Sequence, residues 1–133
     1  MAIIDLGKSA TIDTSADCVV IQKFIEDVPG GRSLDVSGLP DADTVLLAGH
    51  LVIRETATKE YKALGITGGA YVALPAAHTY EGVVRASVKK SEPLASIMVR
   101  GSVNQKAATD AQGLPAYPQA AKDALDLIRF VEA

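Results

Sequence analysis

Short apolar runs separated by polar turns dominate the chain up to about residue 103. Most of the runs contain β-branched residues, and glycine or proline follows several of them. This pattern predicts short strands joined by tight turns. The predicted strands cover residues 18–26, 33–37, 44–55, 61–63, 70–74, 82–90 and 97–103.

Two of these segments carry more detail. Within 44–55, apolar residues flank Gly49-His50, so the pattern fits either one bent strand or two strands across a tight turn. The best-marked run, Ile97-Met98-Val99, leads into Arg100-Gly101 and then a polar shoulder. That segment predicts a strand with a glycine bend, and none of its side chains suggests catalysis.

The hydrophobic period changes near the C-terminus. Apolar residues there fall on one face of a helix, while polar residues fall on the other. The apolar positions are Ala121, Ala124, Leu125 and Ile128. Pro118 suits the first helical position, so we predict a helix from about 118 to 127 and a short strand within 128–133. The chain as a whole is therefore predicted to be mainly β (α+β), with one C-terminal helix.

Composition supports one folded domain. The chain has 133 residues, of which 48% are hydrophobic and 22% are charged, and this balance argues against disorder. Aromatic residues make up 5% and tryptophan is absent, so we expect an aliphatic core. Residues 1–43 hold 3 basic and 8 acidic residues, whereas the net charge of the whole chain is -3. An acidic first third argues against nucleic-acid binding, which needs clustered Lys and Arg.

The cysteine count and the hydropathy pattern indicate in which cellular compartment the chain is made. Cys18 is the single cysteine, so no intrachain disulfide is possible, and the apolar residues after it suggest a buried small side chain. No apolar run is long enough to span a bilayer, and the N-terminus lacks the features of a signal peptide. We therefore expect synthesis in a reducing host cytoplasm and no membrane contact.

No arrangement of residues in the sequence suggests chemistry. His50 and His78 lack the spacing of a zinc site, and we expect surface or structural roles for both. The glycine pairs at 30–31 and 68–69 match turns and not a phosphate-binding loop. We accordingly predict no catalytic residues, no metal, no cofactor and no enzyme activity.

Five segments of the chain, taken in order, resemble segments of one protein family. They are "AGHLVI" (48–53), "KEYKAL" (59–64), "YEGVVRASV" (80–88), "PLASIMVRGSVNQKAA" (93–108) and "AAKDALDLIRFVE" (120–132). Their order resembles that of the head decoration proteins, or head fibre proteins, of tailed bacteriophages. The resemblance implies a small β-barrel or β-tulip-like domain over 44–133. In that domain, 97–103 would be a central strand bent at Arg100-Gly101, and Asn104 would begin the next excursion.

The same resemblance implies a function. Such proteins are homotrimers on the outer surface of the capsid, where they bind the major capsid protein and stabilise the expanded shell. It implies localisation to the virion. We expect residues 1–43 to form an acidic arm or strand region that contacts the capsid or a neighbouring subunit, through Ile3, Ile4, Asp5 and Leu6. Alternatively, Ile3, Ile4 and Leu6 complete the sheet of their own subunit.

Two other functions stay open. One is a small β-barrel binding module for a carbohydrate or a protein ligand. The lack of tryptophan and the wide spacing of the four tyrosines argue against a carbohydrate platform. The other is a subunit of a cytoplasmic enzyme. A trimer in solution favours the capsid protein, whereas a monomer favours the binding module.

Overall fold

The computed structural model describes residues 14–40 and 44–132. Its helices are α1 (Asp17–Val20), α2 (Gln105–Asp110) and α3 (Gln119–Ala124). Its strands are β1 (Ile21–Asp27), β2 (Arg32–Ser33), β3 (Val45–Leu46), β4 (Leu51–Glu55), β5 (Tyr61–Ala63), β6 (Ile66–Thr67), β7 (Ala70–Tyr71), β8 (His78–Val84), β9 (Val88–Lys89), β10 (Leu94–Ala95), β11 (Ile97–Asn104) and β12 (Ile128–Val131). The predicted mainly β class is confirmed, including the C-terminal helix and the strand after it.

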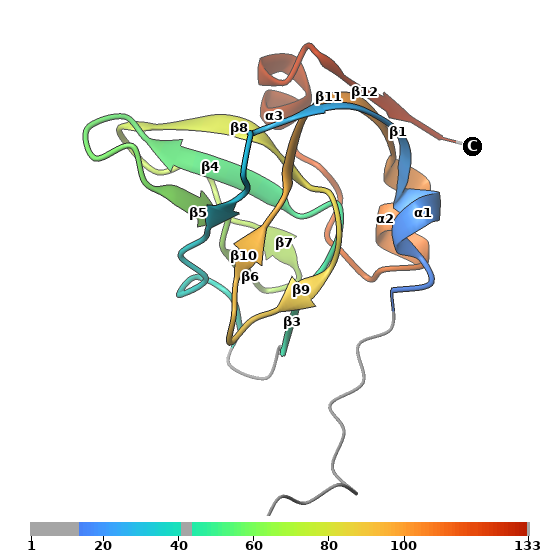
Figure 1. Cartoon of the computed structure of the whole chain (residues 1–133), viewed down its shortest axis with the longest axis horizontal. Helices are drawn as coiled ribbons and strands as arrows, with labels where there is room; N and C mark the ends of the chain where they lie inside the picture. Colours follow the sequence, from blue (N-terminus) through green and yellow to red (C-terminus); the bar gives the residue numbers. More distant parts are fainter. Residues whose placement is uncertain (1–13, 41–43, 133) are drawn as a thin grey trace, which may run out of the picture.

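The main sheet has six strands, in the order β1-β11-β8-β4-β5, with β12 also paired to β11 (Figure 1). Three two-stranded sheets surround it: β2 with β10, β3 with β9, and β6 with β7. None of the sheets in the described part of the chain closes into a barrel, so the small β-barrel that the family resemblance implied is not formed there. Strands β1 and β2, from the predicted N-terminal region, thus pair with strands of the region 44–133.

Strand β11 forms where the apolar run predicted a strand, and it has the most strand partners in the main sheet. It pairs with β1 and β8 antiparallel and with β12 parallel. The strand continues through Gly101 without a break. Gly101 has a φ of +154°, and a Cβ at this position would overlap the carbonyl oxygen of Lys23 in β1. Glycine is therefore needed here for the close approach of two main chains.

The segment 44–55 forms two strands, which settles the alternative that the sequence left open. Strand β3 pairs with β9, whereas β4 pairs with β5 and β8. Gly49 lies in the turn between them with a φ of +93°, and its N–H donates to the Val84 carbonyl at 2.7 Å. A Cβ at Gly49 would lie 2.7 Å from Val20 Cγ1 and 2.9 Å from the Tyr117 hydroxyl, so the turn packs directly against the core.

The first predicted strand begins as a helix. Residues 17–20 form α1, and only Ile21–Asp27 are extended. The N–H groups of Val19 and Val20 both donate to the Ala16 carbonyl, and Asp17 accepts hydrogen bonds from the backbone N–H and the hydroxyl of Ser87. These tertiary contacts override the β-branched sequence. The expectation that Cys18 is buried is wrong, because α1 turns it to the surface.

The strand that the sequence predicted over 82–90 is interrupted. It forms the end of β8 and the short strand β9, with Ser87 between them. Ser87 bonds to Asp17 and also accepts a hydrogen bond from the Ala48 N–H at 3.0 Å. The side-chain and backbone groups of Ser87 thus bond to α1 and the β3–β4 turn. The strand predicted at 33–37 is likewise shorter, because only Arg32–Ser33 pair with β10.

The C-terminal helix is shorter than predicted. It begins after Pro118 and ends at Ala124. Ala121 and Leu125 are buried, but Ala124 is exposed, contrary to the expected stripe. Ile128 is buried as a residue of β12, whose parallel pairing with β11 requires extended backbone. The start of the predicted helix is confirmed within a residue, and the pairing of β12 explains its early end.

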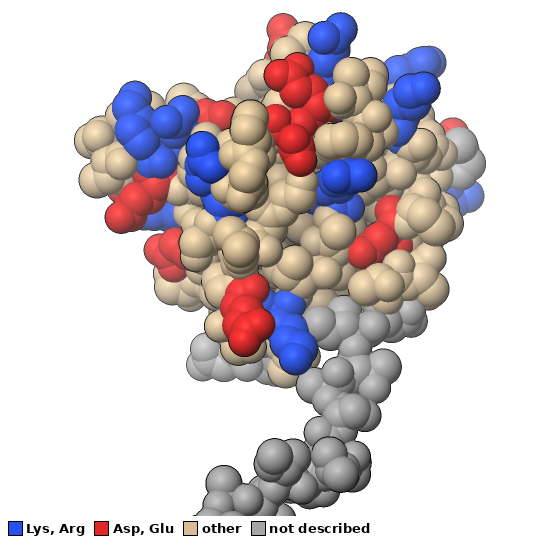
Figure 2. All heavy atoms as spheres, viewed as in Figure 1, with Lys and Arg blue, Asp and Glu red and all other residues tan. Residues whose placement is uncertain are grey.

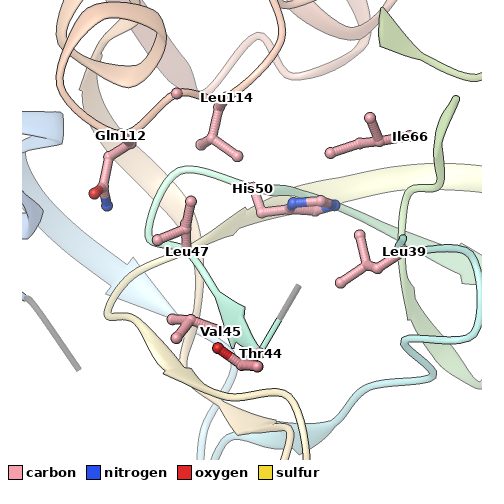
Figure 3. Close-up of a pocket in the computed structure, with 9 residues that line it drawn as sticks. Leu39, Thr44, Val45, Leu47, His50, Ile66, Gln112 and Leu114 are labelled. Atoms are coloured by element: carbon pink, nitrogen blue, oxygen red, sulfur yellow. The ribbon is translucent and has the colours of Figure 1, made fainter. Parts of the chain in front are cut away.

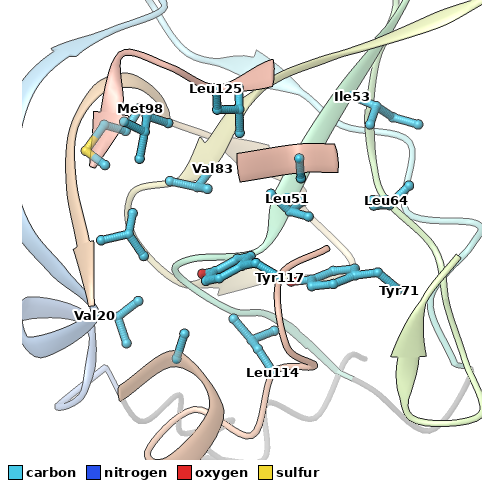
Figure 4. Close-up of a cluster of buried hydrophobic side chains, with 14 of the residues drawn as sticks. Val20, Leu51, Ile53, Leu64, Tyr71, Val83, Met98, Leu114, Tyr117 and Leu125 are labelled. Atoms are coloured by element: carbon cyan, nitrogen blue, oxygen red, sulfur yellow. The ribbon is translucent and has the colours of Figure 1, made fainter. Parts of the chain in front are cut away.

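The core combines aliphatic side chains with two tyrosines that the sequence analysis did not expect (Figure 4). The rings of Tyr71 and Tyr117 stack at 6.2 Å with an interplanar angle of 14°. The Tyr117 hydroxyl donates to the Gly49 carbonyl at 2.6 Å. Burial raises the pKa of both phenols well above the usual value, and Tyr71 adds a smaller electrostatic contribution at Tyr117.

Candidate functional site

The titratable side chains of the described residues do not converge on a site. No group of three or more His, Cys, Asp or Glu in 14–40 and 44–132 is placed to hold a metal ion. His50 is buried, its Nε2 lies 2.7 Å from the Leu64 carbonyl oxygen, and its ring meets Tyr71 edge-on at 5.4 Å. His78 Nδ1 lies 2.8 Å from the Ala76 carbonyl oxygen. Both histidines thus contact backbone carbonyls, which indicates structural roles.

A recess of about 360 Å³ opens beside His50 (Figure 3). It is lined by Leu39, Thr44, Val45, Leu47, His50, Ile66, Gln112, Gly113 and Leu114. His50 is the only titratable side chain in this lining, and its Nε2 is already engaged by a carbonyl. Acid–base catalysis needs a second titratable group or a nucleophile within reach. Among the described lining residues, the recess offers the Thr44 hydroxyl and no second titratable side chain beside His50.

A different surface is more informative for function. Five large hydrophobic side chains of the described residues are exposed, and three of them fall within residues 19–25. These three are Val19 at 48%, Phe24 at 36% and Ile25 at 53% exposure. We call the exposed surface of α1 and β1 that includes them the β1 face. Because successive strand residues point to opposite sides, Phe24 and Ile25 expose apolar surface on both sides of β1. Exposed large apolar side chains concentrated in one short segment suggest an interaction surface.

The position of β1 in the sheet makes this face accessible. Strand β1 ends the order of the main sheet and, in the described part of the chain, pairs only with β11. Its five middle residues are all exposed. The register with β11 shifts three times, between Ile21 and Lys23, between Phe24 and Glu26, and between Glu26 and Asp27. Such bulges disfavour addition of another strand to the edge. A partner would therefore contact the side chains of β1.

Charged side chains border the β1 face. The Arg85 guanidinium lies over the Phe24 ring, 3.7 Å from its centroid. Lys23 and Glu26 are exposed on β1, and Asp27 accepts a hydrogen bond from the Ser96 hydroxyl at 2.8 Å. A hollow of about 360 Å³ lies beside Phe24 and Arg85. An apolar centre with a polar rim and a hollow beside it is the anatomy of many protein interfaces.

The residues predicted to contact a capsid or a neighbour lie elsewhere. Ile3, Ile4, Asp5 and Leu6 fall outside the described residues, so their predicted role stays a prediction. Sequence reasoning did not single out the β1 face. A signal was present, since "VVIQKFI" places apolar residues at both even and odd positions and so on both faces of a strand.

Two further findings concern membranes and relatives. No helix in the described ranges is long and apolar enough to cross a bilayer. No family model matches the chain, and the comparisons with curated proteins and with solved structures found no match either. The likeness to head decoration proteins therefore rests on the order of the sequence segments.

Proposed function

We propose that this chain is a structural virion protein that binds the outer surface of a phage capsid as a homotrimer and stabilises the expanded shell. The single structural observation that supports this proposal is the exposure of three large apolar side chains, Val19, Phe24 and Ile25, within one short segment at the edge of the main sheet. The order of the family-like segments supports the capsid as the setting. In this proposal, the β1 face of one subunit packs against a different surface of the next, because closed rings need head-to-tail contacts.

The magnitudes indicate how such a trimer would form. Full burial of a Val, Ile or Phe side chain contributes about 1.5–3 kcal/mol, and each of these three is already partly buried. The free energy gained by burying all three side chains is similar to the roughly 4–15 kcal/mol that two proteins lose in translational and rotational freedom when they associate. Rim contacts and the shell itself must supply the remainder. Trimers should therefore be held more firmly on the capsid, where contacts act together through effective concentration.

Shell stabilisation then follows from mass action. A ligand that binds the expanded lattice and not its unfolded or contracted forms favours the expanded lattice. At a free concentration of 100 times the dissociation constant, each occupied site contributes about 2.7 kcal/mol. Many sites on one shell add to a large total. No catalytic residue is required for this function.

The alternative of a carbohydrate-binding module is not supported by the tyrosines. Two of the four, Tyr71 and Tyr117, are stacked in the core and cannot form a surface platform. Tyr61 and Tyr80 are half-buried. The β1 face is equally compatible with the other form of the alternative, a binding module for a protein other than a capsid.

One experiment tests the proposal, with a matched pair of variants. The full chain is measured by light scattering over a concentration series and then bound to expanded shells that lack it. We expect trimers at high concentration, saturable binding to the shells and greater resistance of the loaded shells to heat. Ile25→Asp should weaken both association and shell binding. Leu127→Asp, at a side chain that is 62% exposed elsewhere, should change neither.

Two results would overturn the proposal. One is a monomer at every concentration together with no binding to expanded shells. The other is equal loss of association in the two variants, because the effect would then belong to added negative charge and not to the β1 face. Monomers that bind another protein with the β1 face would favour the binding module.

A further inference from the structure

A recess of about 660 Å³ lies on a different part of the surface from the β1 face, beside the β4–β5 hairpin. It is lined by Arg32, Ser33, Leu34, Asp35, Arg54, Lys59, Glu60 and Tyr61. These residues come from β2 and the loop after it, from β4, and from the turn and first residue of β5. Figure 2 shows Lys and Arg atoms gathered over the end of this hairpin, at the left of the view, with acidic atoms nearby.

Two arginines in the recess share one aromatic ring. The guanidinium carbon of Arg54 lies 5.2 Å from the centroid of Tyr61, and that of Arg32 lies 5.8 Å from it. Both distances are within the range of cation–π attraction. The Nη1 of Arg32 also donates to the carbonyl oxygens of Pro29 and Gly31, at 2.9 and 2.7 Å. These contacts hold the two guanidinium groups in place before any ligand arrives.

Neither arginine forms an ion pair with an acidic residue in the part of the chain that the structure describes. In the described residues the only ion pair joins Lys62 and Glu55, at 3.6 Å. The Nε of Arg54 is buried and has no hydrogen-bond partner. A buried donor without a partner costs about 1–3 kcal/mol, and more when the group is charged. A small rotation of the Arg54 side chain that brought this donor to an acceptor on a ligand would remove that cost.

The two carboxylates of the lining do not neutralise the arginines. Asp35 accepts a hydrogen bond from the Ser37 N–H at 3.0 Å, and this bond is the main reason that the pKa of Asp35 lies below its usual value. Glu60 forms no ion pair within the described ranges. Together these two offset part of the charge of Arg32, Arg54 and Lys59 and leave the lining with one net positive charge. A single negative charge therefore complements the recess better than a phosphate dianion or a polyanion.

We propose that this recess binds a carboxylate side chain presented by an acidic segment of a partner protein. A planar carboxylate can accept paired hydrogen bonds from a guanidinium fork, and the Tyr61 ring supports the two guanidinium groups from their other side. The proposal is independent of the capsid function, because it follows from the arrangement of Arg32, Arg54 and Tyr61 and from the net charge of the lining. On a capsid, the acidic segment would belong to the shell. In any other setting, it would belong to another protein partner.

The test uses the full chain and two peptides. The probes are acetyl-Gly-Glu-Gly-Glu-Gly-Glu-amide and the same peptide with Gln in place of Glu. Binding is followed by the NMR signals of the arginine Nε–H groups at low ionic strength, with inorganic phosphate as a second probe. We expect the Glu peptide to shift the Arg54 signal in a saturable way and the Gln peptide to leave it unchanged. We expect phosphate to bind more weakly than the Glu peptide.

Variants separate the arginine fork from charge alone. Arg54→Lys keeps the charge but loses the fork, and it should weaken binding of the Glu peptide about tenfold. Arg54→Gln should weaken it further. Lys89→Gln removes one positive charge from exposed β9 and should leave the affinity unchanged. Backbone signals of β4 and β5 report whether each variant keeps its fold.

Several outcomes contradict the proposal. Equal shifts with the Glu and Gln peptides would exclude recognition of a carboxylate, and this comparison needs no variant to fold. Tighter binding of phosphate than of the Glu peptide would assign the recess to a phosphate ligand. Equal weakening by Lys89→Gln and Arg54→Gln would show attraction to the overall charge of the chain.

Discussion

Strands β4 and β1 each contain three large apolar residues, but these residues lie in different environments. Strand β4, "LVIRE", buries its three apolar residues completely or almost so. Strand β1, "IQKFIED", leaves its five middle residues exposed, among them Phe24 and Ile25. The two belong to the same sheet. They differ in position, because β4 has a neighbour on each side and β1 lies at the edge.

This difference shows that strand composition predicts extended structure better than it predicts burial. Apolar strand residues are favoured wherever a pleated surface is half covered, and the covering element need not belong to the same chain. For β4 the cover comes from the chain's own core. Strand β1 pairs with a described strand along only one edge, and the side chains of its middle residues are exposed. Exposed aromatic and aliphatic side chains of this kind are common in interfaces.

The largest expected effect separates the two strands directly. Leu51→Ala in β4 removes a fully buried side chain and should lower the free energy of unfolding by about 3 kcal/mol. Ile25→Ala in β1 should lower it by less than about 0.5 kcal/mol when measured on the monomer. Urea unfolding at low protein concentration provides both values. Equal losses would mean that Ile25 is packed within its own subunit.

The second prediction concerns the joint between β1 and the rest of the sheet. Gly101→Ala places a Cβ against the Lys23 carbonyl and should cost roughly 2 kcal/mol through overpacking. Hydrogen exchange should accelerate in β1 while β4 keeps its protection. Gly113→Ala is the control, because Gly113 also has a positive φ, of +72°, but a Cβ there meets no atom within 4 Å. Loss of protection in β4 as well would show that the effect of the substitution is not confined to the contact between β1 and β11.

The third prediction concerns Tyr71 and Tyr117, which are buried in the same core as Leu51 of β4. Burial raises the pKa of Tyr71 and Tyr117 above the ordinary tyrosine value of 10.0. Their stabilising contribution is therefore complete below pH 10 and declines as pH rises, because only the unfolded chain releases these protons. Each tyrosine should contribute a slope of about 1.4 kcal/mol per pH unit above pH 10.

Urea unfolding between pH 9 and about pH 11 measures this slope. Tyr117→Phe should reduce it by one tyrosine's share. The same change at half-buried Tyr80, whose pKa is raised by a smaller degree of burial, should reduce it less. A slope that Tyr117→Phe leaves unchanged would contradict the burial of this phenol.

The smallest expected effect lies on the exposed side. Phe24→Ala removes the ring over which Arg85 lies and should cost about 0.5–1 kcal/mol in the monomer, the range of an exposed cation–π contact. Phe24→Leu keeps part of the apolar surface and serves as the control. A cost of several kcal/mol in the monomer would place Phe24 in the core and remove one of the three side chains of the β1 face.

Sequence patterns predicted part of this fold for reasons that are now clear. The run at 97–99 predicted β11 because a central strand is covered on both sides and needs continuous apolar residues. The spacing of Ala121 and Leu125 predicted the start of α3. These signals are local, and contacts with distant residues do not override them.

The remainder depended on contacts between distant residues. Asp17 binds Ser87, which turns Cys18 and Val19 into a helix although β-branched residues follow. The pairing of β12 with β11 shortens α3. The arginine recess joins β2, β4 and β5, and no spacing in the sequence brings Arg32 to Tyr61. Asp17 and Ser87, for example, are hydrogen-bonded although they lie 70 positions apart in the sequence.

The pairing of β1 with β11 also has a consequence during synthesis. Strand β1 emerges from the ribosome early, whereas β11 and Gln112, which bonds to Asp17 across 95 positions, emerge late. At a synthesis rate of about 5–20 residues per second, β1 waits roughly 5–20 s for these partners. During that interval the nascent chain presents an unpaired apolar strand, which is the kind of segment that chaperones bind and that aggregates when they are scarce.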